Sequence, residues 1–244
     1  MKLKRFSILC TLGLAMAFGV TSIATATPHP PDINPASFPG VPVTNPFFPL
    51  LPGTTFYYVG EKDGVSNTNI TKVTCDTKII LGVTTTVVHD RAYDENGKLV
   101  EDTFDWYAQD TAGNVWYFGE DTKELDPATG AVISTEGSWE GGVNDADPGI
   151  IMEAHPRAGD SYYQEFARGV AEDQARVQSL NASACIQQGC FDHLLLTKET
   201  TRLSPGEVEN KYYRWGVGFI FGVIVKGGDE RTELVSPPSF SPCP

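Results

Sequence analysis

Residues 84–121 read TTTVVHDRAYDENGKLVEDTFDWYAQDTAGNVWYFGED. Runs rich in β-branched and aromatic residues are separated here by the turn sequences DENG at 94–97 and DTAG at 110–113. Runs of this kind, bounded by Asp, Asn and Gly, are typical of strands joined by tight turns. The stretch therefore predicts three successive antiparallel strands.

Alternation along the first two strands divides their side chains between two faces, because successive residues point to opposite sides of a sheet. A two-residue turn that pairs Glu95 with Lys98 and a four-residue turn that pairs Tyr93 with Lys98 predict the same division, unless a bulge intervenes. One face carries Val87, His89, Arg91, Val100, Asp102, Phe104 and Trp106. The other carries Val88, Asp90, Ala92, Leu99, Glu101, Thr103, Asp105 and Tyr107. Which face looks into the fold is left open.

The first face offers a candidate catalytic group of His89, Asp102 and Arg91. Asp102 lies opposite His89 in one register and opposite Arg91 in the other. A carboxylate beside a histidine holds the imidazole in one tautomer, as a general base requires, and an arginine can hold an anionic substrate. The alternative is a hydrogen-bonded polar cluster or a solvated outer face, because antiparallel sheets often pair such residues without chemistry.

The second face brings Glu101 and Asp105 together with Tyr107. Four residues along a strand span about 13 Å, whereas the two carboxyl groups of a glycosidase lie roughly 5 to 9.5 Å apart. The pair therefore gives little support to a hydrolase, and a wet acidic face is the alternative.

Aromatic residues are concentrated on the second and third strands. They predict a platform on which a sugar or an aromatic ligand could stack, with core packing as the alternative. The candidate ligand-binding residues are Phe104, Trp106, Tyr107, Trp116 and Tyr117.

Residues 1–26 predict a secretory signal peptide. Three basic residues precede an apolar run at 6–20, and the sequence Ala-Thr-Ala at 24–26 matches a cleavage site. The run is shorter than the roughly 20 residues of a transmembrane helix. We therefore expect export to the periplasm or the cell exterior, without membrane insertion after cleavage.

The remaining chain divides by composition. Residues 27–52 predict a proline-rich extended leader, 53–236 a single β-rich domain and 237–244 a proline-rich tail. The mature chain of 218 residues (244 − 26) has a net charge of −16 (−13 − 3), because three basic residues leave with the signal. Such acidity argues against nucleic acid as a partner and is compatible with a solvated exported protein, a cationic ligand or a divalent metal.

Four cysteines remain after the signal, and an even number in an exported protein predicts disulfides. The short gap between Cys185 and Cys190 suits a local bridge, which leaves Cys75 to pair with Cys243. A Cys-x4-Cys metal site is the alternative, but it lacks a second ligand pair at standard spacing.

Short β-like runs continue beyond residue 121, with one interruption. Glycines and prolines at 137–159 break any period, so we expect a long loop that forms a rim or a lid. Sequential strands with short turns predict an all-β antiparallel meander that forms a barrel or a strongly curved sheet, with a β-sandwich as the alternative.

Within the expected loop at 137–159, Asp145 and Asp147 are candidate calcium ligands, although their spacing is not that of an EF-hand. The sequence has no other cofactor motif.

Three segments resemble a group of uncharacterised bacterial secreted proteins and lipoproteins. They are NPFFPLLPGTTFYY at 45–58, FDWYAQD with GNVWYFGED within 104–121, and KYYRWGVG at 211–218. The resemblance implies export and a β-rich fold that is lipocalin-like by analogy. It implies no activity and no catalytic residues.

These features favour an exported β-barrel protein that binds a small, partly apolar molecule or a saccharide in its concave face. One alternative is a secreted lyase, isomerase or hydrolase that uses His89, Asp102 and Arg91. A second alternative is a structural protein of the envelope or matrix. Loss of turnover without loss of stability in His89→Ala would indicate the enzyme, and loss of affinity in Trp106→Ala would indicate the binding protein. The sequence does not predict the oligomeric state.

Overall fold

The computed structural model describes residue 30 and residues 32–40 and 42–243. This part of the chain forms one antiparallel sheet of 16 strands, with the 3-10 turn η1 (Pro35–Ser37) and no α-helix. None of its helical segments has the length and apolar character of a membrane span. The predicted signal peptide lies outside the described residues.

The strands follow one another along almost the whole described chain. They are β1 (Thr54–Lys62), β2 (Val65–Ile80), β3 (Val83–Tyr93), β4 (Leu99–Gln109), β5 (Val115–Leu125), β6 (Val132–Ser134), β7 (Trp139–Glu140), β8 (Asp147–Met152), β9 (Ser161–Tyr163), β10 (Glu165–Phe166), β11 (Asp173–Ile186), β12 (Gly189–Thr201), β13 (Val208–Arg214), β14 (Gly218–Lys226), β15 (Arg231–Leu234) and β16 (Ser239–Phe240).

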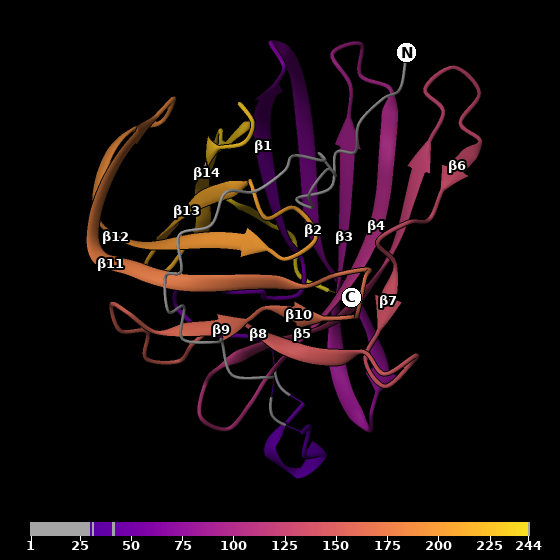
Figure 1. Ribbon diagram of the computed structural model, residues 1–244, viewed down its shortest axis with the longest axis vertical. Coiled ribbons are helices and arrows are strands. Elements are labelled where there is room, and N and C mark those ends of the chain that lie inside the picture. The colour runs from indigo at the N-terminus through magenta and orange to yellow at the C-terminus, as the bar shows by residue number, and fades with distance from the viewer. Residues whose placement is uncertain (1–29, 31, 41, 244) are drawn as a thin grey trace, which may run out of the picture.

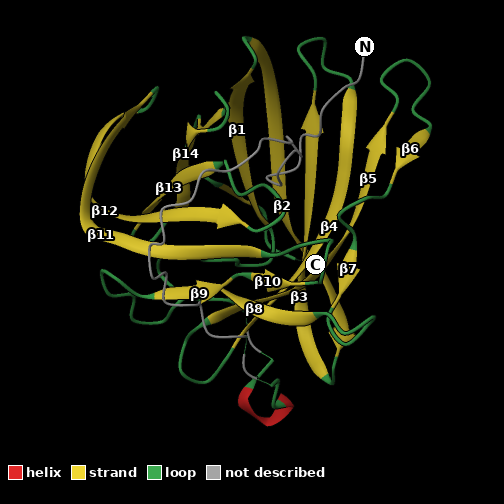
Figure 2. Ribbon diagram, in the orientation of Figure 1, coloured by secondary structure: helices red, strands yellow, loops and turns green. Residues whose placement is uncertain are grey.

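The two edges of this sheet meet, so that it forms a nearly closed barrel. The strand order is β10-β8-β5-β4-β3-β2-β1-β15-β14-β13-β12-β11-β9. The end strands β9 and β10 are separated in the chain by Gln164 alone, whose N–H donates to the carbonyl of Asp173 on β11 at 2.8 Å. We call this meeting place, where β9, Gln164 and β10 face β11, the seam. In Figures 1 and 2, β2 to β5 run steeply while β9, β11 and β12 cross them, as a strongly curved sheet requires. The predicted barrel is confirmed.

The register of β3 and β4 confirms the predicted division into two faces. His89 lies opposite Phe104 and Arg91 opposite Asp102, which is the register of the shorter turn. A bulge after Ala92 shifts the pairing only at the end of the hairpin, where a Gly-containing turn closes it. The face with Val88, Asp90 and Asp105 looks into the barrel, and the face with His89 looks outward.

The outer face of β3 to β5 has a small apolar core of its own. Val87, Trp106, Trp116 and Phe118 are buried there, partly under Phe38 of the leader. The ring centroids of Phe38 lie 6.1 Å from Trp116 and 5.5 Å from Phe118, both edge to face. The leader therefore hides aromatic surface that an open strand face would expose to water.

The leader also closes part of the barrel interior. Val43 and Leu50 form an antiparallel bridge and are buried in the main core. Phe48 and Leu50 line the interior cavity, and Phe48 packs against Tyr107 of β4 with ring centroids 5.4 Å apart. Apolar residues of the leader thus serve as part of the core.

The prediction of a long loop at 137–159 is wrong, because this segment contains two strands of the sheet, β7 and β8. β7 and β8 both pair with β5, and β8 also pairs with β10. Glycine here permits close approach: a Cβ on Gly149 would lie 2.5 Å from backbone atoms of Tyr163 and Gln164. The segment predicted to be a rim or lid is therefore part of the barrel wall.

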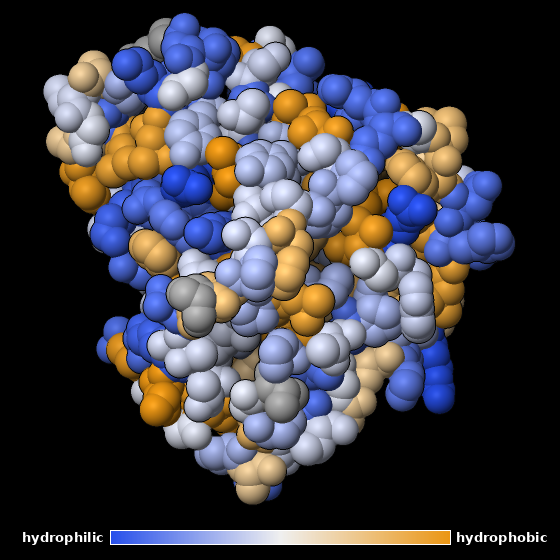
Figure 3. All heavy atoms as spheres, turned by 180° about the vertical axis from the view of Figure 1, so that it is seen from behind, coloured by the Kyte–Doolittle hydropathy of each residue, from blue (hydrophilic) through white to orange (hydrophobic). Residues whose placement is uncertain are grey.

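Both predicted disulfides are confirmed. Cys75 is bonded to Cys243, which ties the end of the described chain to β2 across 168 residues. Cys185 is bonded to Cys190 across the β11–β12 turn. On the side of the molecule in Figure 3, hydrophilic residues cover much of the surface and hydrophobic residues form separate groups between them.

Candidate functional site

The barrel encloses a cavity of about 220 Å³. An engineered protein cavity of about 150 Å³ holds benzene, so this one has room for a single ring with a short substituent. Part of its lining is apolar and aromatic, and the leader and several strands contribute to it. This part consists of Phe48, Leu50, Phe56, Tyr58, Val217 and Phe219.

The rest of the lining is strongly acidic. Seven lining residues are Asp or Glu, and one, Lys211, is a cation. The ammonium of Lys211 pairs with Glu199 at 2.7 Å and with Glu209 at 3.5 Å, neither of which lines the cavity, and Glu230 of the lining pairs with Lys62. The seven acidic residues are Asp90, Glu101, Asp105, Glu120, Glu165, Asp173 and Glu230.

On β3 and β4 these carboxylates have uncharged hydrogen-bond donors. Thr71 Oγ1 donates to Asp90 Oδ2 at 2.8 Å, and Tyr117 Oη donates to Asp105 Oδ1 at 2.6 Å. Thr103 Oγ1 donates to Glu101 Oε1 at the longer distance of 3.3 Å. Since hydroxyl groups bring no counter-charge, the carboxylates here are satisfied as hydrogen-bond acceptors but not neutralised.

Buried polar atoms without partners lie at the seam and on the nearby strand β5. Glu120 on β5 is 5% exposed and Gln164 is 3% exposed, and both line the cavity. Glu120 Oε1, Gln164 Nε2 and Asp173 Oδ1 have no hydrogen-bond partner among the described residues. A buried polar group without a partner costs about 1–3 kcal/mol, and such groups are uncommon in folded proteins. The seam end of the cavity is therefore where a ligand would gain most from hydrogen bonding.

Burial changes the protonation of the cavity carboxyls. It raises the pKa of Glu101 to about 8, helped by the nearby charges of Asp90 and Asp105. Burial likewise raises the pKa of Asp105 to about 7, against the opposing hydrogen bond from Tyr117. Desolvation and neighbouring acids raise the pKa of Glu120 well above its usual range. Part of this cluster is therefore protonated at neutral pH, because like charges in a dry space cannot all ionise.

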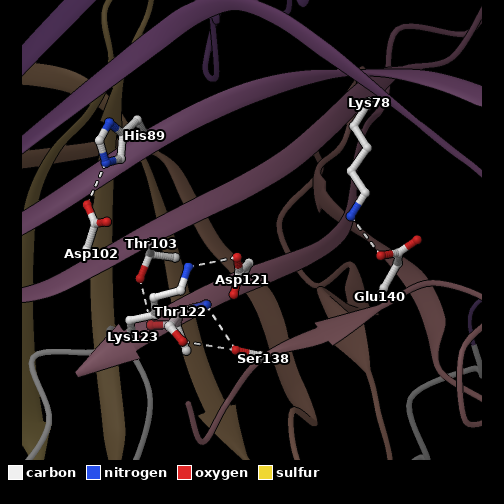
Figure 4. A network of polar contacts seen from close by, with 9 residues as sticks. All are labelled: Lys78, His89, Asp102, Thr103, Asp121, Thr122, Lys123, Ser138 and Glu140. Carbon is white, nitrogen blue, oxygen red and sulfur yellow. Dashed lines mark hydrogen bonds and ion pairs between the residues drawn. The ribbon is translucent and has the colours of Figure 1, made fainter. Parts of the chain in front are cut away.

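The predicted catalytic group lies on the outer face, away from this cavity. His89 Nε2 is 2.6 Å from Asp102 Oδ1, and the imidazole stacks on Phe104 with ring centroids 4.2 Å apart. Figure 4 shows His89 and Asp102 pointing toward each other from neighbouring strands. Arg91 is opposite Asp102 in the register, but its Nε has no hydrogen-bond partner in the described part of the chain. The structure thus brings His89 and Asp102 together, and their catalytic role stays a prediction.

The five predicted ligand-binding aromatics are divided between the two faces. Tyr107 and Tyr117 line the cavity and stack with ring centroids 4.8 Å apart. Phe104, Trp106 and Trp116 belong to the outer apolar core. Trp106 there lies under the ammonium of Lys78, 3.4 Å from its ring centroid, and that ammonium also pairs with Glu140 (Figure 4).

The candidate calcium ligands lie in a turn before β8. Asp145 is exposed and has a φ of +57°, and Asp147 begins the strand. Within the described residues, no group of three or more His, Cys, Asp or Glu side chains is arranged to hold a metal ion. The calcium prediction gains no support from this geometry.

The acidic residues of β5 and the seam were not predicted from the sequence. Alternation continued from the inward Tyr117 would place Glu120 on the outer face. A register shift after Trp106 instead pairs Glu120 with Asp105 inside the barrel. The shift is accommodated at Gly119, where φ is +132° and a Cβ would lie 2.3 Å from a backbone oxygen of β7. A glycine within a strand pattern is the signal that could have indicated this bulge.

Comparisons with known proteins give two distant structural likenesses. A candidate exported protein with a YmcC-like fold from Bacteroides fragilis NCTC 9343 is 11% identical, with a TM-score of 0.47 over 80% of this chain and 100% of that one. A candidate lipoprotein from Parabacteroides distasonis ATCC 8503 is also 11% identical, with a TM-score of 0.42 over 79% of this chain and 98% of that one. No protein-family model matches the chain, and no curated protein does.

Proposed function

We propose that this chain is an exported protein that binds a small, partly apolar ligand inside its barrel. The observation that carries the proposal is the cavity of about 220 Å³, which combines an aromatic lining with unpaired polar atoms at the seam. A mostly apolar pocket with a few converging polar groups is the usual form of a small-molecule site. The predicted signal at 1–26 and the two disulfides support export, because disulfides persist in oxidising compartments.

The two ends of the cavity differ in chemistry, so they would contact different parts of the ligand. Phe56, Tyr58 and Phe219 would contact an apolar ring, because all three line the cavity. The ring centroid of Tyr58 lies 6.4 Å from that of Phe56 and 5.5 Å from that of Phe219. The polar end would lie at the seam, near Glu120 and Gln164. The stacked pair of Tyr107 and Tyr117 supplies aromatic surface beside Asp105.

The first test is native mass spectrometry of the purified exported protein. We expect a bound small molecule that is released on denaturation. A protein that is always empty would contradict tight binding, and titration calorimetry with neutral, cationic and anionic single-ring compounds would then test weak binding. Absence of binding to every compound would contradict the proposal and favour the structural alternative.

A matched pair of variants tests where binding occurs. Tyr107 and Trp106 are neighbours on β4 that point to opposite faces. Tyr107→Leu should lower the affinity for the best single-ring compound about 2- to 10-fold, the value of an aromatic contact. Trp106→Leu should leave that affinity unchanged. The opposite result would place the site on the outer face, where His89 and Asp102 lie.

A further inference from the structure

The three unpaired atoms belong to side chains from separate parts of the chain that line one cavity of the barrel. Glu120 lies on β5, Gln164 between β9 and β10, and Asp173 at the start of β11. Glu165, also in the cavity lining, accepts a hydrogen bond from Trp139 Nε1 at 3.0 Å. Glu120 and Gln164 are more than nine-tenths buried, and both side chains line the cavity, so a ligand inside it would lie against them.

The acidic groups around these atoms favour a ligand with a positive charge. Asp105 is the register partner of Glu120, so two carboxyl groups lie side by side on the inner face. Carboxyl groups directly opposite each other on neighbouring strands repel when both are ionised. A cation between them removes that repulsion, whereas an anion would increase it. Among the described residues of the lining, Lys211 is the one cation, and it pairs with Glu199 and Glu209.

We propose that the seam end of the cavity binds the ammonium group of a primary amine whose single ring lies against the aromatic lining. This rests on the proposed function and names the class of ligand. A primary ammonium has three N–H donors, and Glu120 Oε1 and Asp173 Oδ1 are free acceptors. The amide of Gln164 can turn its oxygen to the ligand by a half-rotation. The aromatic rings beside the site also favour a cation through their π faces.

Three single-ring probes of similar size and different charge test this inference. Benzylammonium, benzyl alcohol and benzoate would each be titrated into the full mature protein by calorimetry at pH 7.5. Benzylammonium should bind at least tenfold more tightly than benzyl alcohol, and benzoate should bind most weakly. Equal affinity of the ammonium and the alcohol would overturn the cation inference while leaving the proposed function intact. Failure of all three to bind would overturn the inference and count against the proposed function as well.

Adjacent residues on β5 provide a matched pair of variants. Glu120→Gln keeps the shape of the side chain and removes the carboxylate that would pair with the ammonium, so it should weaken benzylammonium binding about 10- to 100-fold, the value of a hydrogen bond to a charged group. Its effect on benzyl alcohol should be small. Asp121→Asn changes the next residue, which points outward and pairs with Lys123 at 2.9 Å, and should leave both affinities unchanged.

Asp173→Asn is a second variant that keeps the test decisive if Glu120→Gln does not fold. It should reduce the preference for benzylammonium over benzyl alcohol in the same direction, and circular dichroism and melting would confirm its fold. A folded variant at either position that keeps the full preference for the cation would overturn the assignment of the ammonium to the seam.

Discussion

The two faces of the β3–β4 hairpin both carry carboxylates beside aromatic rings, yet their surroundings differ. Outside, Asp102 has a histidine partner, and the side chains of His89 and Asp102 are 22% and 27% exposed. Inside, Glu101 and Asp105 have only hydroxyl donors, and burial raises the pKa of both. The outer pair is thus a locally satisfied contact, whereas the inner carboxyls form a site with more acid than the protein itself neutralises.

The largest effect is expected from removing the aromatic support of the inner face. Tyr117 stacks on Tyr107, packs edge to face on Trp139 and donates to Asp105. Tyr117→Ala should lower the free energy of unfolding by about 3–5 kcal/mol, measured by urea denaturation. Tyr117→Phe keeps the ring and should cost about 1–3 kcal/mol, because it leaves a buried acceptor unpaired. A loss below about 1 kcal/mol in the alanine variant would show that the inner face is not tightly packed.

The second prediction concerns a substitution that disturbs the register shift at Gly119, which places Glu120 on the inner face of the barrel. Gly119→Ala puts a Cβ 2.3 Å from a backbone oxygen at a φ of +132°, so it adds a steric clash to backbone strain. We expect a loss of about 2–4 kcal/mol from these two costs together. The control Gly97→Ala has a φ of +72° but open space around its Cβ, so it should cost only about 1–2 kcal/mol. If Gly119→Ala and Gly97→Ala lower the free energy of unfolding equally in denaturation experiments, the bulge at Gly119 is not required for the stability of the fold.

The third prediction concerns pH. Because the pKa values of Glu101 and Asp105 are raised to about 8 and about 7 in the folded state, that state holds protons which the unfolded chain has lost above pH 4 to 5. The stability from these groups is therefore complete below about pH 4 and is lost as pH rises toward 8, at up to about 1.4 kcal/mol per pH unit for each carboxyl.

Urea denaturation at pH 5, 6, 7 and 8 would measure this slope, and Glu101→Gln should flatten it. Asp126 in the exposed β5–β6 turn is the control, since hydrogen bonds from Thr129 lower its pKa. It is ionised in both states throughout this range, so Asp126→Asn should leave the slope unchanged. Stability that stays constant or rises between pH 5 and 8 would contradict the account of a protonated inner face.

The smallest effect is expected on the outer face. His89→Ala removes a partly exposed pair and a stacking contact with Phe104, so it should cost about 1 kcal/mol or less in thermal or urea denaturation. A cost above about 2 kcal/mol would show that the outer pair contributes to stability as the inner face does. Complete loss of a measured turnover in this variant, with an unchanged melting temperature, would instead support the enzymatic alternative.

Local features of the chain were predictable from the sequence. The turns at 94–97 and 110–113, the division of β3 and β4 into two faces, and the pairing of Cys185 with Cys190 all depend on residues close together in the chain. The prediction failed at 137–159, where glycine indicates a loop but in fact allows β8 to lie against the backbone near Gln164. Close approach and chain reversal both favour glycine, and a single sequence does not distinguish them.

Side-chain alternation is a property of any strand, so the amino-acid order alone places His89, Arg91 and Asp102 on one face and Glu101, Asp105 and Tyr107 on the other. Which face is inside follows from the folded barrel, since it depends on how the whole sheet curves and on the leader that covers its outer surface. The bulge at Gly119 and the closure of the barrel also place Glu120, Gln164 and Asp173, from distant parts of the chain, in the lining of one cavity.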